Sequence, residues 1–210
     1  MATIHRWNES LEEARGRLLR GEYAKARSAM IPLKRQMMEL LGSGAEAEKA
    51  LGLALVYEAV AEEGLGQRER ASWSWNLAAQ VYPGFREIPD TLVGEPVNAL
   101  RERTHECLPN AASEGAGPGI PEPPRVRMKP KPGYTAGASK LEIEGQLVVR
   151  MIVGADGRPR CPVVLQSLPA PSLTVQVLES VYKWEFEPAS INGTAVDAFY
   201  HLTTDFRGRR

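Results

Sequence analysis

The sequence predicts an α+β protein, with an N-terminal all-α domain of helical hairpins and a C-terminal domain in which one helix packs on a small antiparallel sheet. Three observations support this. Apolar residues keep helical spacing over residues 8–82, 11 of the 25 residues in 109–133 are proline or glycine, and alternating apolar segments occur in the last third. The predicted organisation is a helical domain (1–108), a linker (109–133) and a sheet domain (134–210).

Breaks at Gly21, at 42–44 and at 64–66 divide the helical region into four segments of about 12 to 20 residues, which predicts two helical hairpins. When the sequence is aligned with itself at an offset of 45 residues, Gly21 matches Gly66 and Ala26 matches Ala71. Such small residues allow close helix packing. Residues 85–107 are expected to add a capping helix. The second hairpin resembles a tetratricopeptide repeat in Ala50, Tyr57, Ala61, Gly64, Ala71, Ala78, Ala79 and Pro83.

Trp73 and Trp75 are candidates for a ligand groove on the helical repeat. Because they are two positions apart, they face different ways on a helix. We expect one to be core. The other is either core as well or an exposed anchor on the concave side of the repeat.

The proline- and glycine-rich segment is expected to act as an extended linker, which could hold the two halves up to roughly 75 Å apart at about 3.1 Å per residue. Arg125, Arg127, Lys129 and Lys131 alternate within it. Such cations could contact an anionic polymer or a membrane, but solvation of the linker is the favoured interpretation.

The first strand of the C-terminal domain is predicted over Leu147–Val153, where both faces are largely apolar, so this strand should be central. Asp156-Gly157 then predicts a turn into a second strand around 163–168. Ser172 is expected to cap a helix whose apolar positions, from Leu173 to Trp184, keep helical spacing.

The last strand is predicted over 196–206, after a hairpin turn at Asn192-Gly193. Apolar and polar residues alternate along it, which is typical of a half-exposed strand. The order strand, strand, helix, strand places this last strand at an edge of the sheet, with free backbone donors and acceptors.

These residues resemble the C-terminal domain of TonB-type energy transducers, from about Tyr134 to Phe206. The resemblance rests on three separated groups of matches. The matching residues are Tyr134, Ala138, Glu144, Gly145, Leu147 and Val149 at the start, Asp156 and Gly157 at the turn, and Leu173, Val181, Trp184, Phe186, Pro188 and Ala189 at the end of the helix.

The resemblance implies a periplasmic domain that captures a short extended peptide from an outer-membrane TonB-dependent receptor by strand addition. Along the last strand, the expected selecting side chains are Phe199, His201, Thr203 and Asp205, with Tyr134 near the entry to the site. In the alternative, the edge pairs with itself in a homodimer and the helical repeat docks partners, as in a structural or assembly protein.

No enzyme, cofactor or metal site is predicted. The carboxylate pairs, such as Glu185 and Glu187, lack a predicted pocket that would shift a pKa, and no nucleotide-binding or hydrolase motif occurs. His5, His105 and His201 are far apart in sequence. The two cysteines, Cys107 and Cys161, favour inert thiols over a disulfide that joins the halves.

The charge distribution and the hydropathy limit the possible partners and the possible location. The region up to Leu108 has 14 basic and 16 acidic residues, and the remainder has 12 and 10, so neither half is built to bind nucleic acid. No segment reaches the roughly 18 to 20 apolar residues of a membrane span. We expect a periplasmic or envelope location if a leader or anchor preceded Met1, and a cytoplasmic one otherwise.

Overall fold

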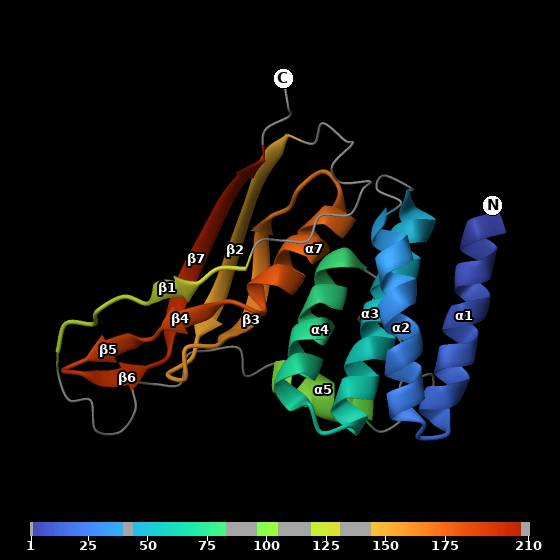
Figure 1. Ribbon diagram of the computed structural model, residues 1–210, viewed down its shortest axis with the longest axis horizontal. Helices are drawn as coiled ribbons and strands as arrows, with labels where there is room; N and C mark the ends of the chain where they lie inside the picture. The colour runs from blue at the N-terminus through green and yellow to red at the C-terminus, as the bar shows by residue number, and fades with distance from the viewer. Residues whose placement is uncertain (1, 40–43, 83–95, 105–118, 131–143, 207–210) are drawn as a thin grey trace.

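A computed structural model describes residues 2–39, 44–82, 96–104, 119–130 and 144–206. The fold is α+β, as predicted. A row of helices from the N-terminal region lies beside a sheet from the C-terminal region, and the helix α7 lies between them (Figure 1).

The N-terminal region consists of α1 (Ala2–Leu19), α2 (Tyr23–Glu39), α3 (Ala45–Gly64) and α4 (Arg68–Val81), with α5 (Pro96–Thr104) packed against α3 and α4. Successive helices from α1 to α4 lie side by side and run in opposite directions (Figure 1). The two predicted hairpins are therefore present, and the predicted capping helix is represented by α5. The resemblance to a tetratricopeptide repeat stays a prediction.

Glycines stand at helix boundaries where the sequence predicts breaks, with Gly21 and Gly66 after α1 and α3 and Gly44 just before α3. Gly21, Gly44 and Gly66 have φ angles of +70°, +83° and +74°, a left-handed conformation that glycine adopts without a steric penalty. Ala26 and Ala71, which the 45-residue shift superposes, are both fully buried. Both alanines therefore lie in the core of the helical region.

The main sheet has the strand order β3-β2-β7 and is antiparallel throughout. Its strands are β2 (Gly145–Val153), β3 (Pro159–Gln166) and β7 (Ala198–Phe206), and α7 (Pro171–Val181) covers one face. The predictions of a central first strand and a last strand at the edge are confirmed. The predicted cap at Ser172 is wrong, because α7 already begins at Pro171, a residue suited to the first helical position since it has no N–H to satisfy.

Two short two-stranded sheets complete the C-terminal region. The first pairs β1 (Arg125–Met128) with β4 (Glu185–Glu187), and the second pairs β5 (Ala189–Ile191) with β6 (Thr194–Val196). Asn192 and Gly193 join β5 to β6 with φ angles of +52° and +79°, so the predicted hairpin turn is confirmed.

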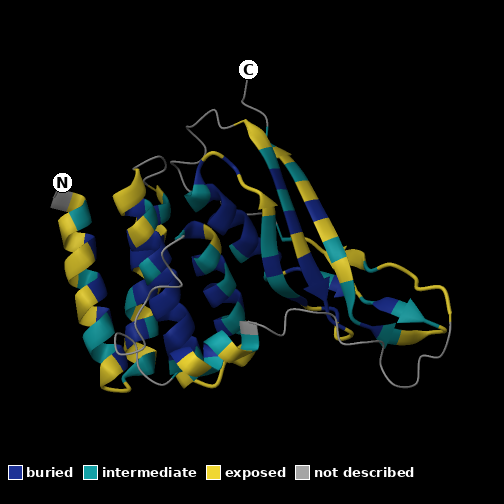
Figure 2. Ribbon diagram, turned by 180° about the vertical axis from the view of Figure 1, so that it is seen from behind, coloured by how far each residue is buried: buried dark blue, intermediate teal, exposed yellow. Residues whose placement is uncertain are grey.

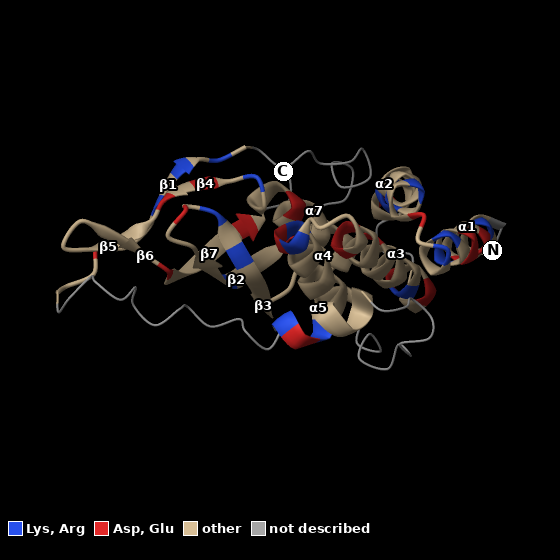
Figure 3. Cartoon of the chain, turned by 90° about the horizontal axis from the view of Figure 1, so that it is seen from below, with Lys and Arg blue, Asp and Glu red and all other residues tan. Residues whose placement is uncertain are grey.

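The described part of the predicted linker, residues 119–130, is not a free spacer. Its strand β1 places Arg125 opposite Glu187, and Figure 3 shows the basic residues of β1 beside the acidic residues of β4. The ammonium of Lys129 lies 4.8 Å from the ring centroid of Trp184. The segment therefore belongs to the C-terminal module, with Lys129 placed over an aromatic ring of that module, while Arg125 and Arg127 remain exposed to solvent.

The two halves share one continuous hydrophobic core, so the expectation that the linker holds them apart is wrong. Helix α4 packs against β3, and α7 contacts α2, α3 and α4. The rings of Trp73 in α4 and Tyr182 after α7 lie 5.3 Å apart. The reason is that α7 carries apolar residues on more than one face and is buried nearly all round, so one face covers the sheet and another packs on the helices.

Gly157 in the β2–β3 turn offers a stability test with a matched control. A Cβ at Gly157 would lie 2.3 Å from the backbone oxygen of Phe186, whereas a Cβ at Gly193 would meet nothing within 4 Å; both residues have positive φ. We expect Gly193→Ala to cost about 1 to 2 kcal/mol from backbone strain alone, and Gly157→Ala to cost about 1 kcal/mol more. Denaturant unfolding of both variants checks this, and equal losses would contradict the close approach of the turn to β4.

Candidate functional site

The outer edge of β7 is the open edge of the main sheet. Nine residues of β7 pair with β2 in an unbroken register, from Ala198 opposite Val153 to Phe206 opposite Gly145. Within the described residues, no strand pairs with the other side of β7. The opposite edge of the sheet, β3, is packed against α4 (Figure 1). Among the described residues, one of the two edges is therefore open to an added strand and the other is covered.

The side chains of β7 alternate between solvent and core, as predicted. Phe199, His201, Thr203 and Asp205 are exposed, whereas Leu202 is buried. Figure 2 shows this alternation along the strand. The four predicted selecting residues thus share the face of the sheet opposite to α7, and the structure brings them together as a row.

Side chains of β2 hold two members of this row in place. The guanidinium of Arg150 lies 5.2 Å from the ring centroid of Phe199, and the side-chain amide of Gln146 donates a hydrogen bond of 2.9 Å to Asp205 Oδ1. These contacts limit rotamer freedom, so less entropy is lost when a ligand binds. The other face of β7 is tied to the core, where the rings of Tyr200 and Phe186 lie 5.0 Å apart.

The remaining predicted site residues do not join this row. Tyr134 lies outside the described residues. Trp73 and Trp75 are 1% and 3% exposed, so neither is an exposed anchor in this structure. Both are core residues, and the ring of Trp73 packs against Tyr182 of the C-terminal region.

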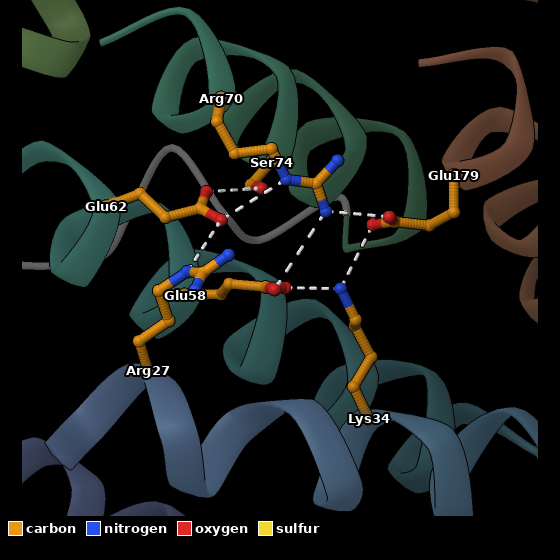
Figure 4. Close-up of polar contacts among 7 residues, drawn as sticks. All are labelled: Arg27, Lys34, Glu58, Glu62, Arg70, Ser74 and Glu179. Atoms are coloured by element: carbon orange, nitrogen blue, oxygen red, sulfur yellow. Dashed lines mark hydrogen bonds and ion pairs between the residues drawn. The ribbon is translucent and has the colours of Figure 1, made fainter. Parts of the chain in front are cut away.

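A buried ion network between the two halves was missed by sequence reasoning. Glu179 of α7 accepts hydrogen bonds from Lys34 Nζ of α2 at 3.0 Å and from Arg70 Nη2 of α4 at 2.7 Å (Figure 4). Lys34 also donates to Glu58, and Arg70 donates to Glu62 at 3.2 Å. Charges from α2, α3, α4 and α7 therefore meet at one point, which fixes how α7 docks on the helical region.

Local sequence contains a signal for part of this network. Glu58 and Glu62 stand one turn apart in the middle of the apolar run of α3, and Lys34 follows the buried Leu33 in α2. Charged side chains are almost never fully buried unless they pair with an opposite charge, so a charged residue inside an apolar run predicts a buried ion pair. The partner on α7 could not be found this way, because Glu179 is 145 residues from Lys34.

The network shifts the pKa values of its carboxyl groups in opposite directions. Burial disfavours the charge on Glu179, but Lys34 and Arg70 outweigh this and lower the pKa of Glu179 to about 2. Burial and the neighbouring Glu58 raise the pKa of Glu62. Burial disfavours the charge on Lys34, yet Glu179 and Glu58 outweigh it and raise the pKa of Lys34.

These shifts predict an acid-dependent loss of stability. Because the pKa of Glu179 is lower in the folded state than its usual 4.5, its contribution is present above pH 4.5 and is lost as the pH falls towards 2. The loss should be about 3 kcal/mol, and protonation of Glu62 offsets part of it. We expect Glu179→Gln to have a flatter stability profile between pH 5 and 2, measured by urea unfolding. The exposed Glu9→Gln is the control, and a Glu179→Gln profile as steep as the parent's would contradict this account.

Cys161 is disulfide-bonded, so the prediction of an inert thiol at this position is wrong. The other cysteine of the chain, Cys107, lies outside the described residues. Cys161 also has a φ of +49°, which is uncommon for a residue with a side chain.

Among the described residues, no helix is long and apolar enough to span a membrane, and no group of three His, Cys, Asp or Glu side chains could hold a metal ion.

Comparisons with known proteins agree with the geometry of the C-terminal module. Residues 130–207 match the family described as Gram-negative bacterial TonB protein C-terminal. The chain is also similar to Protein TonB of Escherichia coli (strain K12), with 35% identity over 65 residues. That similarity spans 31% of this chain and 27% of the Escherichia coli protein, so the chain matches about a quarter of that relative. Residues 130–207 of this chain are therefore a TonB C-terminal domain.

Proposed function

We propose that this protein is a non-enzymatic adaptor of the cell envelope, and that its TonB C-terminal domain captures an extended peptide as an added strand on β7. The observation that carries the proposal is the asymmetry of the sheet. The edge of β3 is packed against α4, while the edge of β7 is open among the described residues. Backbone groups along this edge supply hydrogen bonds to a peptide of any sequence.

Selectivity then comes from alternate side chains. An added strand places every second residue beside Phe199, His201, Thr203 and Asp205 on the open face. An aromatic ring at one end of this row and a carboxylate at the other favour a peptide with an apolar residue and a basic residue in matching positions. The similarity to Protein TonB makes an extended segment of an outer-membrane receptor the favoured partner.

Two observations support an envelope location. The first is the match to a domain of Gram-negative bacterial TonB. The second is the disulfide at Cys161, since disulfides persist in oxidising compartments such as the periplasm and are rare in the cytosol.

Adjacent proline substitutions in β7 provide the experiment. Successive residues of a strand direct their N–H groups to opposite sides, so one of Thr203→Pro and Thr204→Pro removes a bond to β2 and the other removes a donor from the open edge. We expect the first kind of variant to lose stability. The second should keep its melting temperature and bind peptides from receptor plug segments at least about tenfold more weakly.

Fluorescence anisotropy with labelled peptides, together with thermal melting, separates the two variants. If the stable variant binds the peptides as tightly as the parent protein, strand addition on β7 is ruled out.

A second candidate function is homodimerisation through the same edge. It is favoured by the length of β7 and by Phe199, which is 44% exposed on a strand with little charge to discourage pairing. In this case the protein acts in assembly, and light scattering should reveal a stable dimer that the receptor peptides do not dissociate. The stable proline variant would then be monomeric.

A further inference from the structure

A groove of about 1260 Å³ is lined in part by Lys34, Glu58, Arg70 and Glu179 of the ion network and by no residue of β7. One wall is α2, with Ile31 and Met38, and the opposite wall is the end of α7, with Tyr182 and Lys183. The turn before α4 and its first residues, including Arg68, close one end. The groove is thus formed jointly by the N-terminal helices and the TonB C-terminal domain, and neither part alone would contain it.

The groove carries an excess of positive charge. Its lining has six basic and three acidic residues. Three of the cations and the buried carboxylates neutralise one another, because Arg27, Lys34 and Arg70 pair with Glu58, Glu62 and Glu179. Glu69 bonds to Arg160, so the excess of positive charge comes from Arg35, Arg68 and Lys183. The basic residues are Arg27, Lys34, Arg35, Arg68, Arg70 and Lys183, and the acidic ones are Glu58, Glu69 and Glu179.

Two of these cations are free to meet a ligand. Arg68 and Lys183 are exposed, and neither has an ion-pair partner in the part of the chain that the structure describes. Arg35 is also accessible, with 78% of its side chain exposed and a distant contact of 3.7 Å to Glu39. Cations that face solvent on several walls of one concave surface focus the field and attract anionic groups.

The same groove offers apolar surface. Ile31 is 47% exposed, and it lines the groove together with Pro32 and the half-buried Met38. Tyr182 contributes an aromatic ring on the other side, held by the guanidinium of Arg70 at 4.6 Å. A ligand that combines carboxylates with an aliphatic side chain matches this lining.

The dimensions fit a peptide rather than a small metabolite. Along α2 the lining runs from Arg27 to Met38, which at 1.5 Å per residue is roughly 16 Å. This length accommodates about five residues of extended chain. The volume exceeds the range of about 300 to 1,000 Å³ that is usual for small-molecule sites.

We propose that this composite groove binds an acidic peptide segment of a partner protein, with Arg68 and Lys183 contacting its carboxylates and Ile31 contacting an aliphatic side chain. The proposal does not depend on strand addition at β7. It gives the protein two peptide-binding surfaces, which is what an adaptor requires.

The test uses the full chain and the fluorescein-labelled peptide Glu-Glu-Leu-Glu-Glu in an anisotropy titration at low salt. We expect saturable binding that Arg68→Glu/Lys183→Glu weakens at least about tenfold. The matched control is Arg6→Glu/Lys49→Glu, which makes the same change in net charge at exposed positions outside the groove lining and should change the affinity less than about twofold. Thermal melting confirms that both variants are folded.

Ile31→Ser separates apolar recognition from simple charge attraction. It should weaken binding of the leucine peptide but leave binding of Glu-Glu-Ser-Glu-Glu unchanged. The proposal is overturned if the parent protein does not bind the leucine peptide, if both double variants weaken binding equally, or if Ile31→Ser has no effect. Plug-segment peptides that bind on β7 should not compete, so failure here leaves the proposed function untouched.

Discussion

Replacing Lys34 with methionine is expected to lower the free energy of unfolding by about 3 to 5 kcal/mol, because it leaves buried carboxylates without their cation. Lys34 is 6% exposed and donates to both Glu58 and Glu179. Methionine fills a similar volume, so the loss reports on charge rather than on packing. Urea unfolding at pH 7 measures it.

A second substitution identifies the cause. In Lys34→Met/Glu58→Met, one uncompensated carboxylate is removed as well, so part of the lost stability should return even though a further charged residue is missing. Lys25→Met is the surface control, since 71% of the Lys25 side chain is exposed. A Lys34→Met variant that is as stable as Lys25→Met would show that the network does not hold the two halves together.

Replacing Trp73 with alanine is also expected to cost about 3 to 5 kcal/mol, because it opens a cavity at the junction of the two halves. The side chain is 1% exposed and packs against Tyr182. Its Nε1 has no hydrogen-bond partner among the described residues, so the loss is one of packing alone. Chemical denaturation followed by circular dichroism gives the value.

The conservative variant Trp73→Phe should lose only about 1 to 2 kcal/mol, since it keeps an aromatic ring against Tyr182. The stability and the partner binding of Trp73→Ala together distinguish a core residue from a ligand anchor. If Trp73→Ala retains its stability but loses binding of a partner, Trp73 acts in a groove and the packing described here is contradicted.

Local patterns predict much of this fold. Glycines at positive φ end the helices because few other residues adopt that conformation cheaply, and Gly21 and Gly66 were found in this way. The two apolar faces of β2 place it at the centre of the sheet, and the turn at Asn192-Gly193 fixes the final hairpin. The strand order predicts the open edge of β7, and the alternation of apolar and polar residues predicts its row of exposed side chains.

Contacts between distant residues could not be predicted from local patterns. Strand β1 lies in a proline-rich segment where basic and apolar residues alternate only from Arg125 to Lys129, and it forms because β4, 60 residues later, offers backbone partners. In the same way, Glu179 gives no sign of burial on its own helix until Lys34 and Arg70 are brought beside it. The docking of the halves, the covered Trp73 and the composite groove all depend on such contacts.

Amide hydrogen exchange of β7, with and without a receptor plug-segment peptide, tests the central claim most directly. If the peptide adds as a strand, every second amide between Ala198 and Phe206 should gain protection, because those N–H groups point to the open edge and receive new acceptors. Amides that already bond to β2 should change little. Protection confined to α2 and α7, or no change in β7 at saturating peptide, would contradict capture at this edge.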